Sequence, residues 1–325
     1  MRNLARARPP FLTAPIKGEG DAASRARLNC VDAVTVARWP MTPRAISDFL
    51  ARDPCICAEL TQVRGSSPRN AGAFILINAE TALGTIGGGA LEYLVIDRAR
   101  QVIRNGLAGG ELDVPLGPEI GQCCGGRVTV RMRIVDDARA RNLVAAAEAE
   151  AVARPNVYLF GAGHVGQALA RALSLLPLRI QVIDTRPDEL DGLPDGVESR
   201  AVAVPEAVVR NAPAGSAYVI LTHDHALDFL IACEALKRAD SPYVGMVGSK
   251  TKRAKFSSWY LGEGGDAAAL DRLVLPIGGN GFGDKRPEVI AALAAAEIMV
   301  HIACREAYRE ARPVTKGALG TVDGR

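Results

Sequence analysis

The feature that most constrains the fold is a glycine-rich turn, GAGHVG, at residues 161–166. It follows an apolar run at 157–160 that is typical of a buried strand, and it precedes a segment at 167–176 that is predicted to be a helix. In such a strand–turn–helix unit the glycines allow a tight turn, close approach of a phosphate and close packing of helix on strand. The turn therefore predicts an α/β domain, whose ligand is a dinucleotide, another phosphate or none.

The second half of the chain repeats this strand–helix pattern. Five apolar runs are expected to be its strands: 157–160, 180–183, 217–221, 243–247 and 273–277. Repeated βα units form a parallel sheet that helices cover on both faces. We expect a Rossmann-like domain over residues 153–312, followed by a loose tail at 313–325.

The first half lacks strict alternation, which favours a smaller α+β domain over residues 41–152. A short helix, two apolar strands, a longer helix and a further strand are expected at 42–50, 55–63, 73–77, 90–104 and 128–134. An alanine-rich helix over about residues 137–152 is expected to lead to the domain boundary at 154–156. Residues 1–40 contain several prolines and lack periodicity, so they are expected to be a flexible leader.

Composition and charge exclude several classes of function. Residues 1–40 hold seven Lys/Arg and three acidic residues, and the rest of the chain holds 32 basic and 33 acidic residues, so no basic field indicates nucleic acid. No signal peptide or membrane span is expected, because Glu297 and His301 interrupt the most apolar late run. Seven scattered cysteines, an odd number, favour a reducing compartment. These features predict a cytoplasmic protein.

Two adjacent cysteines lie in a glycine frame, GQCCGG, at residues 121–126. Small neighbours leave room for a bulky ligand to reach the backbone and the thiolates of Cys123 and Cys124. The alternative is that the two cysteines are apolar filler in a tight turn. Cys55 and Cys57 alternate on one face of an expected strand, which predicts that both lie in the core.

Two further loops of the first domain carry ligand-binding chemistry. The loop 65–69 offers the hydroxyl groups of Ser66 and Ser67 and the guanidinium of Arg69 to a polar or acidic group. The glycines at 87–89 precede a helix and form a candidate anion nest. Together with the cysteine pair, these loops predict a single pocket.

The second domain places polar residues after its strands, where open parallel sheets bind ligands. Asp184 ends one strand, where an acidic group would bind ribose hydroxyls. His223 and His225 follow another strand and could hold a metal ion or shuttle protons. The alternative is that Asp224, between them, only caps the next helix.

A turn containing Ser249 and Lys250 follows the next expected strand. Its free N–H groups and the Lys250 ammonium predict an anion pocket at a helix start. Lys252 and Lys255 fit a solvated basic helix face better than a binding site.

Seven segments, in order, resemble the signature of the xanthine dehydrogenase accessory protein family, XdhC/CoxI. They are Gly65–Arg69, Gly84–Glu92, Gly121–Gly126, Gly161–Gly166, Thr222–His225, Gly245–Lys250 and Pro276–Gly278. The resemblance covers about Met41 to Cys304. Residues 1–40 and the glycine-rich run 279–283 depart from the pattern.

The resemblance implies a cofactor-insertion chaperone rather than an enzyme. Such proteins bind the molybdenum cofactor (molybdopterin) transiently, hold it while a cysteine desulfurase adds the terminal sulfur ligand, and pass it to apo-xanthine dehydrogenase. We also expect a homo-oligomer, a dimer. On this basis Cys123 or Cys124 contacts the molybdenum, because a thiolate suits a soft metal site, while Gln122 and Ser66 or Ser67 hold the pterin. The residues expected to contact the cofactor are Ser66, Ser67, Arg69, Gly87, Gly88, Gly89, Gln122, Cys123, Cys124, Gly125, Gly126, Gly161, Gly163, His164, Gly166, Asp184, His223, His225, Ser249 and Lys250.

Two other functions stay open at the level of sequence. A dehydrogenase would bind NAD(P) at the turn 161–166 and use the histidines at 223 and 225 for proton transfer. A thiol redox sensor would use Cys123 and Cys124, although the disulfide of adjacent cysteines is strained. Titration with NADH, followed by a test for turnover, separates the dehydrogenase from the accessory protein.

Overall fold

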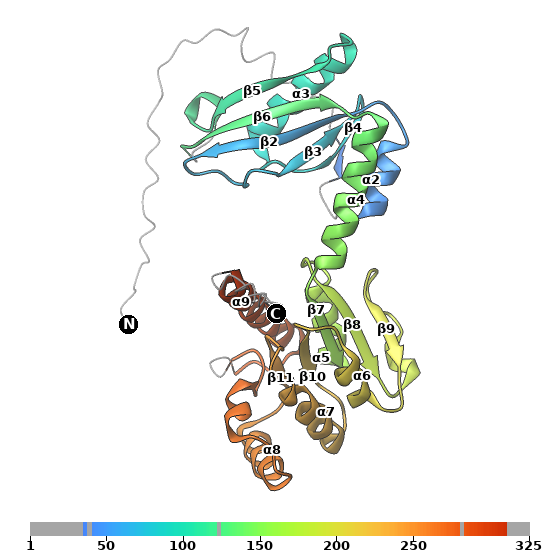
Figure 1. The fold of residues 1–325 in the computed structure, drawn as a ribbon, viewed down its shortest axis with the longest axis vertical. Helices are drawn as coiled ribbons and strands as arrows, with labels where there is room; N and C mark the ends of the chain where they lie inside the picture. The colour runs from blue at the N-terminus through green and yellow to red at the C-terminus, as the bar shows by residue number, and fades with distance from the viewer. Residues whose placement is uncertain (1–34, 38–40, 122–124, 280–282, 311–325) are drawn as a thin grey trace, which may run out of the picture. The chain divides into compact units, whose positions relative to one another are not determined.

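The computed structural model describes residues 35–37, 41–121, 125–279 and 283–310 (Figure 1). The chain divides into two compact units between Ala147 and Glu148, inside helix α4 (Asp137–Ala153). Each unit is built on its own sheet, so each is described by itself.

The described residues of unit 1 form a six-stranded sheet. Its strands, in sheet order, are β1 (Thr35–Ala37), β4 (Thr81–Gly84), β3 (Phe74–Ile77), β2 (Ile56–Arg64), β6 (Arg127–Ile134) and β5 (Gly109–Pro115). β1 pairs with β4 in parallel, and the other neighbouring strands are antiparallel. The prediction of a flexible leader at 1–40 is wrong for residues 35–37, because their backbone pairs with β4. The rest of that leader lies outside the described residues.

Helices cover both faces of this sheet. Helix α3 (Gly89–Arg104) packs its apolar side against one face, with Leu91, Val95 and Ala99 fully buried. Helix α2 (Pro43–Leu50) and α4 pack against the other face, where Ile46 and Phe49 meet Cys55 and Cys57. The predicted core position of these two cysteines is confirmed, and burial raises the pKa of Cys55 to about 11 and that of Cys57 to about 12.

The described residues of unit 2 form a six-stranded parallel sheet. Its strands, in sheet order, are β12 (Leu273–Val274), β11 (Val244–Met246), β10 (Ala217–Ile220), β7 (Asn156–Phe160), β8 (Arg179–Asp184) and β9 (Glu198–Ala201). The helices between the strands are α5 (His164–Leu173), α6 (Pro205–Asn211), α7 (His225–Lys237) and α8 (Lys250–Gly262), and α9 (Pro287–Glu310) follows β12. Short 3-10 turns, η3 (Pro187–Leu190) and η4 (Ala267–Arg272), complete the unit.

Strand β7 shows why both faces of this sheet are covered. Its Val157 and Leu159 face α5 and α9, whereas Tyr158 and Phe160 face α6, α7 and α8. Burying a side chain such as Leu159 or Phe160 contributes roughly 1.5–3 kcal/mol, so a strand that is apolar on both sides needs a layer on each. The predicted Rossmann-like domain, preceded by a smaller α+β domain, is confirmed.

Helix α9 is unusually apolar. Among the described residues, its segment Pro287–Arg305 is long and apolar enough to cross a membrane by length and composition alone, with a mean hydropathy of 1.6. Its Ala291, Ala294 and Ile298 are buried in the core with α5 and the sheet. One face of α9 therefore packs on the sheet, while most of its apolar segment is not buried within the described structure.

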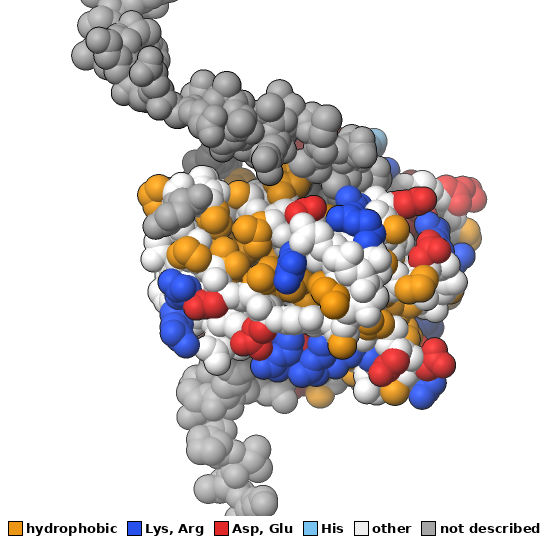
Figure 2. All heavy atoms as spheres, turned by 90° about the horizontal axis from the view of Figure 1, so that it is seen from above, with side chains coloured by type: hydrophobic (Ala, Val, Ile, Leu, Met, Phe, Trp, Pro, Cys, Tyr) orange, Lys and Arg blue, Asp and Glu red, His pale blue; other side chains and the backbone are white. Residues whose placement is uncertain are grey.

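Charged side chains of both signs are mixed on the face that Figure 2 displays, with apolar side chains between them. Ion pairs between neighbouring strands of unit 1 also place opposite charges next to each other. Arg127 Nε lies 2.8 Å from Asp113 Oδ2, and Arg131 Nε lies 3.1 Å from Glu111 Oε2, between β6 and β5. These exposed pairs neutralise neighbouring charges and contribute little to stability.

Candidate functional site

Three loops of unit 1 meet at the end of β2. A Cβ atom placed on Gly126 would lie 2.0 Å from the Ser66 carbonyl oxygen, so only glycine fits between the two loops. Gly87 has a φ of +133°, and a Cβ atom there would lie 2.4 Å from Cγ of Pro68. Loop 65–69 therefore lies against both Gly126 and Gly87, while the single pocket predicted for loop 65–69, the glycines 87–89 and the cysteine pair stays a prediction.

The third loop is closed at its base by backbone hydrogen bonds. Gly125 N–H donates to the Leu116 carbonyl and Leu116 N–H donates to the Gly126 carbonyl, both at 2.8 Å. A Cβ atom on Gly125 would meet open space, so this glycine leaves room beside the loop. Gln122, Cys123 and Cys124 lie outside the described residues, and their contacts stay predictions.

The glycine turn at 87–89 already holds an anion, the carboxylate of Glu92. Glu92 is 3% exposed, and its Oε1 accepts hydrogen bonds from Ile86 N–H at 3.0 Å, Gly88 N–H at 2.9 Å and the Thr85 hydroxyl. These donors are the ones that an external anion would need. Gly87 N–H in turn donates to the Thr85 hydroxyl at 3.1 Å, so two N–H groups of this turn already have acceptors inside the chain. That Gly87, Gly88 and Gly89 bind a ligand anion stays a prediction.

The loop 65–69 contains a buried hydroxyl without a partner. Ser67 Oγ is buried and has no hydrogen-bond partner among the described residues, whereas Ser66 and Arg69 are exposed. A buried polar atom left unpaired costs about 1–3 kcal/mol and indicates a missing water or ligand. Ser67 therefore fits the predicted binding role better than any other described residue of the three loops.

In unit 2, the glycines of the turn 161–166 serve different purposes. A Cβ atom on Gly161 would lie 2.3 Å from the Leu221 carbonyl oxygen, and one on Gly166 would lie 2.0 Å from the Gly161 carbonyl oxygen. Both glycines are therefore required by packing. A Cβ atom on Gly163 would meet nothing, so this position leaves space for a ligand beside the exposed His164.

Asp184 is engaged by its own chain. Its carboxylate accepts hydrogen bonds from Ala162 N–H at 2.8 Å and from the backbone and guanidinium of Arg186, and its side chain is 3% exposed. Burial by itself would raise the pKa of Asp184, but the hydrogen bonds from Arg186 and Ala162 outweigh it and lower the pKa. The ribose contact stays a prediction, and it would require Arg186 to release the carboxylate.

A pocket of about 700 Å³ adjoins the turn 161–166. Gly163, His164 and Arg171 line one side of it. Four carboxylates also line it: Asp188, Glu189, Asp191 and Glu288. This excess of negative charge disfavours a pyrophosphate in the pocket.

The histidine loop and the serine turn cap the helices that follow them. Asp224 accepts a hydrogen bond from Ala226 N–H at the start of α7, and Ser249 accepts one from Lys252 N–H at the start of α8. His223, His225 and Lys250 are exposed. No group of three His, Cys, Asp or Glu side chains in the described part of the chain is arranged to hold a metal ion. The capping interpretation of Asp224 is thus supported.

A buried ion pair beneath these two loops was missed by the sequence reasoning. Asp228 is fully buried; it accepts a hydrogen bond from the Lys252 ammonium and two from Thr222, at 3.0 Å from N–H and 2.7 Å from the hydroxyl. The prediction that Lys252 belongs to a solvated face is wrong, because its side chain is only 10% exposed. Gly248 leaves room for the Lys252 side chain, because a Cβ atom on Gly248 would lie 2.6 Å from Lys252 Cδ.

Together, the sheets and loops define a two-domain protein with a Rossmann-like second half. Comparison with known families agrees with this class. Residues 157–298 match the XdhC Rossmann domain, and residues 50–112 match the XdhC and CoxI family. The chain belongs to the XdhC/CoxI family.

Similar proteins add the following. The uncharacterized protein YqeB of Escherichia coli K12 is 26% identical over 256 residues, which cover 76% of this chain and 43% of YqeB, so this chain spans less than half of that relative. A crystal structure from Bacillus halodurans, BH1974, described as a xanthine dehydrogenase, matches with a TM-score of 0.69. The match covers 82% of this chain and 97% of the other at 19% identity, and it shows a shared fold.

Proposed function

We propose that this protein is a cytoplasmic accessory factor that carries the molybdenum cofactor to an apo-xanthine dehydrogenase. Membership of the XdhC/CoxI family supports an accessory role. In this proposal the cofactor is a transient cargo, a cysteine desulfurase adds its terminal sulfur ligand, and the carrier acts as a homodimer.

The observation that carries the proposal is the close approach of loop 65–69 to Gly126, with a buried Ser67 hydroxyl that has no partner in the described part of the chain. The cargo presents a phosphate, a hydrogen-bonding pterin and a metal with sulfur ligands. Ser67 supplies a hydroxyl for the pterin and Arg69 an exposed guanidinium for the phosphate. Cys123 or Cys124 supplies a thiolate for the metal. The turn at 87–89 is held by Glu92, and its contact with the cargo stays a prediction.

The test is cofactor retention on the anaerobically purified full chain, measured by pterin oxidation fluorescence and by molybdenum analysis of the same sample. We expect Cys123→Ala or Cys124→Ala to lose the cargo. Ser67→Ala should weaken binding roughly five- to thirtyfold, as a loss of 1–2 kcal/mol requires. Cys304→Ala is the matched control, because Cys304 is an exposed cysteine of α9. Wild-type retention in all three site variants would refute the proposal.

The alternative, an NAD(P)-dependent oxidoreductase, is favoured by the open space beside Gly163. The engaged carboxylate of Asp184 and the four carboxylates of the adjoining pocket weigh against it. Fluorescence titration with NADH decides between them: saturable binding with turnover favours the oxidoreductase. A cofactor-dependent gain of xanthine dehydrogenase activity on adding this protein favours the carrier.

A further inference from the structure

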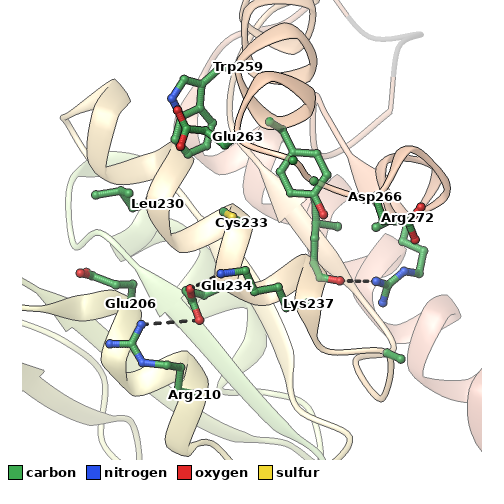
Figure 3. A pocket seen from close by; sticks show the side chains of 16 residues that line it. Glu206, Arg210, Leu230, Cys233, Glu234, Lys237, Trp259, Glu263, Asp266 and Arg272 are labelled. Carbon is green, nitrogen blue, oxygen red and sulfur yellow. Dashed lines mark hydrogen bonds and ion pairs between the residues drawn. The ribbon is translucent and has the colours of Figure 1, made fainter.

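A second pocket of unit 2, of about 640 Å³, lies among α6, α7, α8 and η4 (Figure 3). Its volume is within the roughly 300–1,000 Å³ that small-molecule sites span. It is lined by the C-terminal parts of α7 and α8, whereas the polar loops at 222–225 and 248–250 precede the first residues of these helices. The pocket is therefore distinct from the ligand-binding edge of the sheet.

One wall of this pocket is aromatic. Trp259 and Tyr260 of α8 line it together with Cys233 of α7. Figure 3 shows Trp259 and Cys233 on the two helices. The indole of Trp259 is held by ring contacts with Phe229, at 5.5 Å between centroids, and with Phe256, at 6.1 Å. A fixed, half-exposed indole offers a face to which organic cations bind, and their apolar stems pack on the same wall.

The cationic side chains of the lining are already engaged. Glu234 binds both Lys237, at 2.7 Å, and Arg210, at 3.5 Å. Arg272 donates to the carbonyl oxygens of Leu236 and Arg238 at the end of α7. An incoming anion would have to break these interactions first.

Two carboxylates of the lining are free. Glu206 and Glu263 have no side-chain hydrogen bond or ion pair within the described parts of the chain, whereas Asp266 caps η4 by accepting from Ala268 N–H. Glu263 follows Trp259 by four residues and its N–H donates to the Trp259 carbonyl, so the two lie on one side of α8. Since α7 and α8 also end here, their dipoles add negative potential.

We propose that this pocket binds an organic cation, an ammonium or guanidinium group on a short apolar stem. The stem packs against Trp259, and the carboxylates of Glu206 and Glu263 balance the charge. A free amine and an arginine side chain of another protein share this chemistry. The site goes beyond cofactor delivery and stands whether or not the chain carries the molybdenum cofactor.

The chain contains two tryptophans, Trp39 and Trp259, so Trp39→Phe leaves Trp259 as the only indole fluorophore. Titrating this full-length variant with agmatine should quench or shift the emission saturably. Adding Glu206→Gln and Glu263→Gln should weaken binding at least about tenfold, which corresponds to 1.4 kcal/mol. The matched control, Glu80→Gln with Glu148→Gln, removes two exposed carboxylates outside the pocket and should leave the affinity unchanged.

Two further arms identify the source of the cation. Binding of agmatine together with a blocked Gly-Arg-Gly peptide supports a protein side chain, whereas binding of agmatine alone supports a free amine. No saturable agmatine response overturns the proposal, as does equal affinity in the Glu206→Gln/Glu263→Gln variant. A response to inorganic phosphate instead of agmatine also overturns it, because Arg210 and Lys237 would then form the site. Thermal unfolding of each variant confirms that it is folded.

Discussion

The ion pair between Asp228 and Lys252 makes a quantitative prediction about the stability of unit 2. Asp228→Asn keeps the size of the side chain and an oxygen for Thr222, but it removes the negative charge opposite the Lys252 ammonium. Among the described residues, the Lys252 ammonium then keeps its hydrogen bond to the Val247 carbonyl, at 2.9 Å, as its one remaining partner. With the Lys252 side chain 10% exposed, water cannot replace the lost partner in full.

Removing one member of a buried ion pair costs about 3–5 kcal/mol, because the remaining charge is buried without compensation. With a denaturant slope of about 2 kcal/mol/M in urea, this lowers the unfolding midpoint by about 1.5–2.5 M. Asp228→Asn combined with Lys252→Met removes both charges. The double variant should therefore be less destabilised than the sum of the two single variants.

The assay is urea unfolding followed by the emission of Trp259, with Trp39→Phe as the background, so that the signal reports on unit 2. Lys255→Met, at an exposed position of the same helix, is the control and should shift stability by no more than about 0.5 kcal/mol. A midpoint shift below about 0.5 M for Asp228→Asn, or strict additivity in the double variant, would refute the reasoning.

Three further predictions concern the loops and the charged turns. Glu92→Ala removes the buried acceptor of Ile86 N–H and of the Thr85 hydroxyl, so thermal unfolding should show a loss of at least about 2 kcal/mol, while the exposed-site control Glu80→Ala should be near neutral. Gly126→Ala forces the Ser66 loop to move and should cost about 1–3 kcal/mol, whereas Gly110→Ala, where a Cβ atom meets nothing, should be tolerated; equal losses would contradict the predicted contact. The hydrogen bond from Arg238 lowers the pKa of Asp240 to about 2, below its value of about 3.9 in an unfolded chain. The stabilisation by Asp240 is therefore complete above pH 4 and is lost as the pH falls toward 2, so Asp240→Asn should flatten the dependence of the urea midpoint on pH in that window; an unchanged slope would count against the pairing.

The sequence predicted the second domain well, because its strands are continuous apolar runs with helices between them. β9 was missed, since Glu198, Ser199, Arg200 and Ala201 are all exposed at the edge of the sheet and show no apolar pattern. β5 was missed for a similar reason: only Val114 of its residues is buried, whereas Glu111 and Asp113 are exposed. Edge strands bury little, so their pairing is decided by neighbours that are distant in sequence.

The sequence predicted which loops form the candidate site, but it did not predict the hydrogen bonds and ion pairs that these loops make. The glycines showed where two loops approach closely, as at Gly126 beside the Ser66 carbonyl and at Gly87 beside the Pro68 ring. Spacing did not show that Glu92 fills the turn before its own helix, or that Lys252 reaches Asp228. Both are charged residues that only the folded chain buries, so their partners are fixed by tertiary packing.

The carboxylate of Glu92 also ties two parts of unit 1 together mechanically. It belongs to the first turn of α3, it holds the backbone of the preceding turn, and Gly87 of that turn lies against Pro68. A tilt of the first turn of α3 therefore has to displace the serine loop as well. Binding of the cargo to the serine loop should therefore slow amide hydrogen exchange in the first residues of α3. Exchange in α3 would then report on binding at the serine loop.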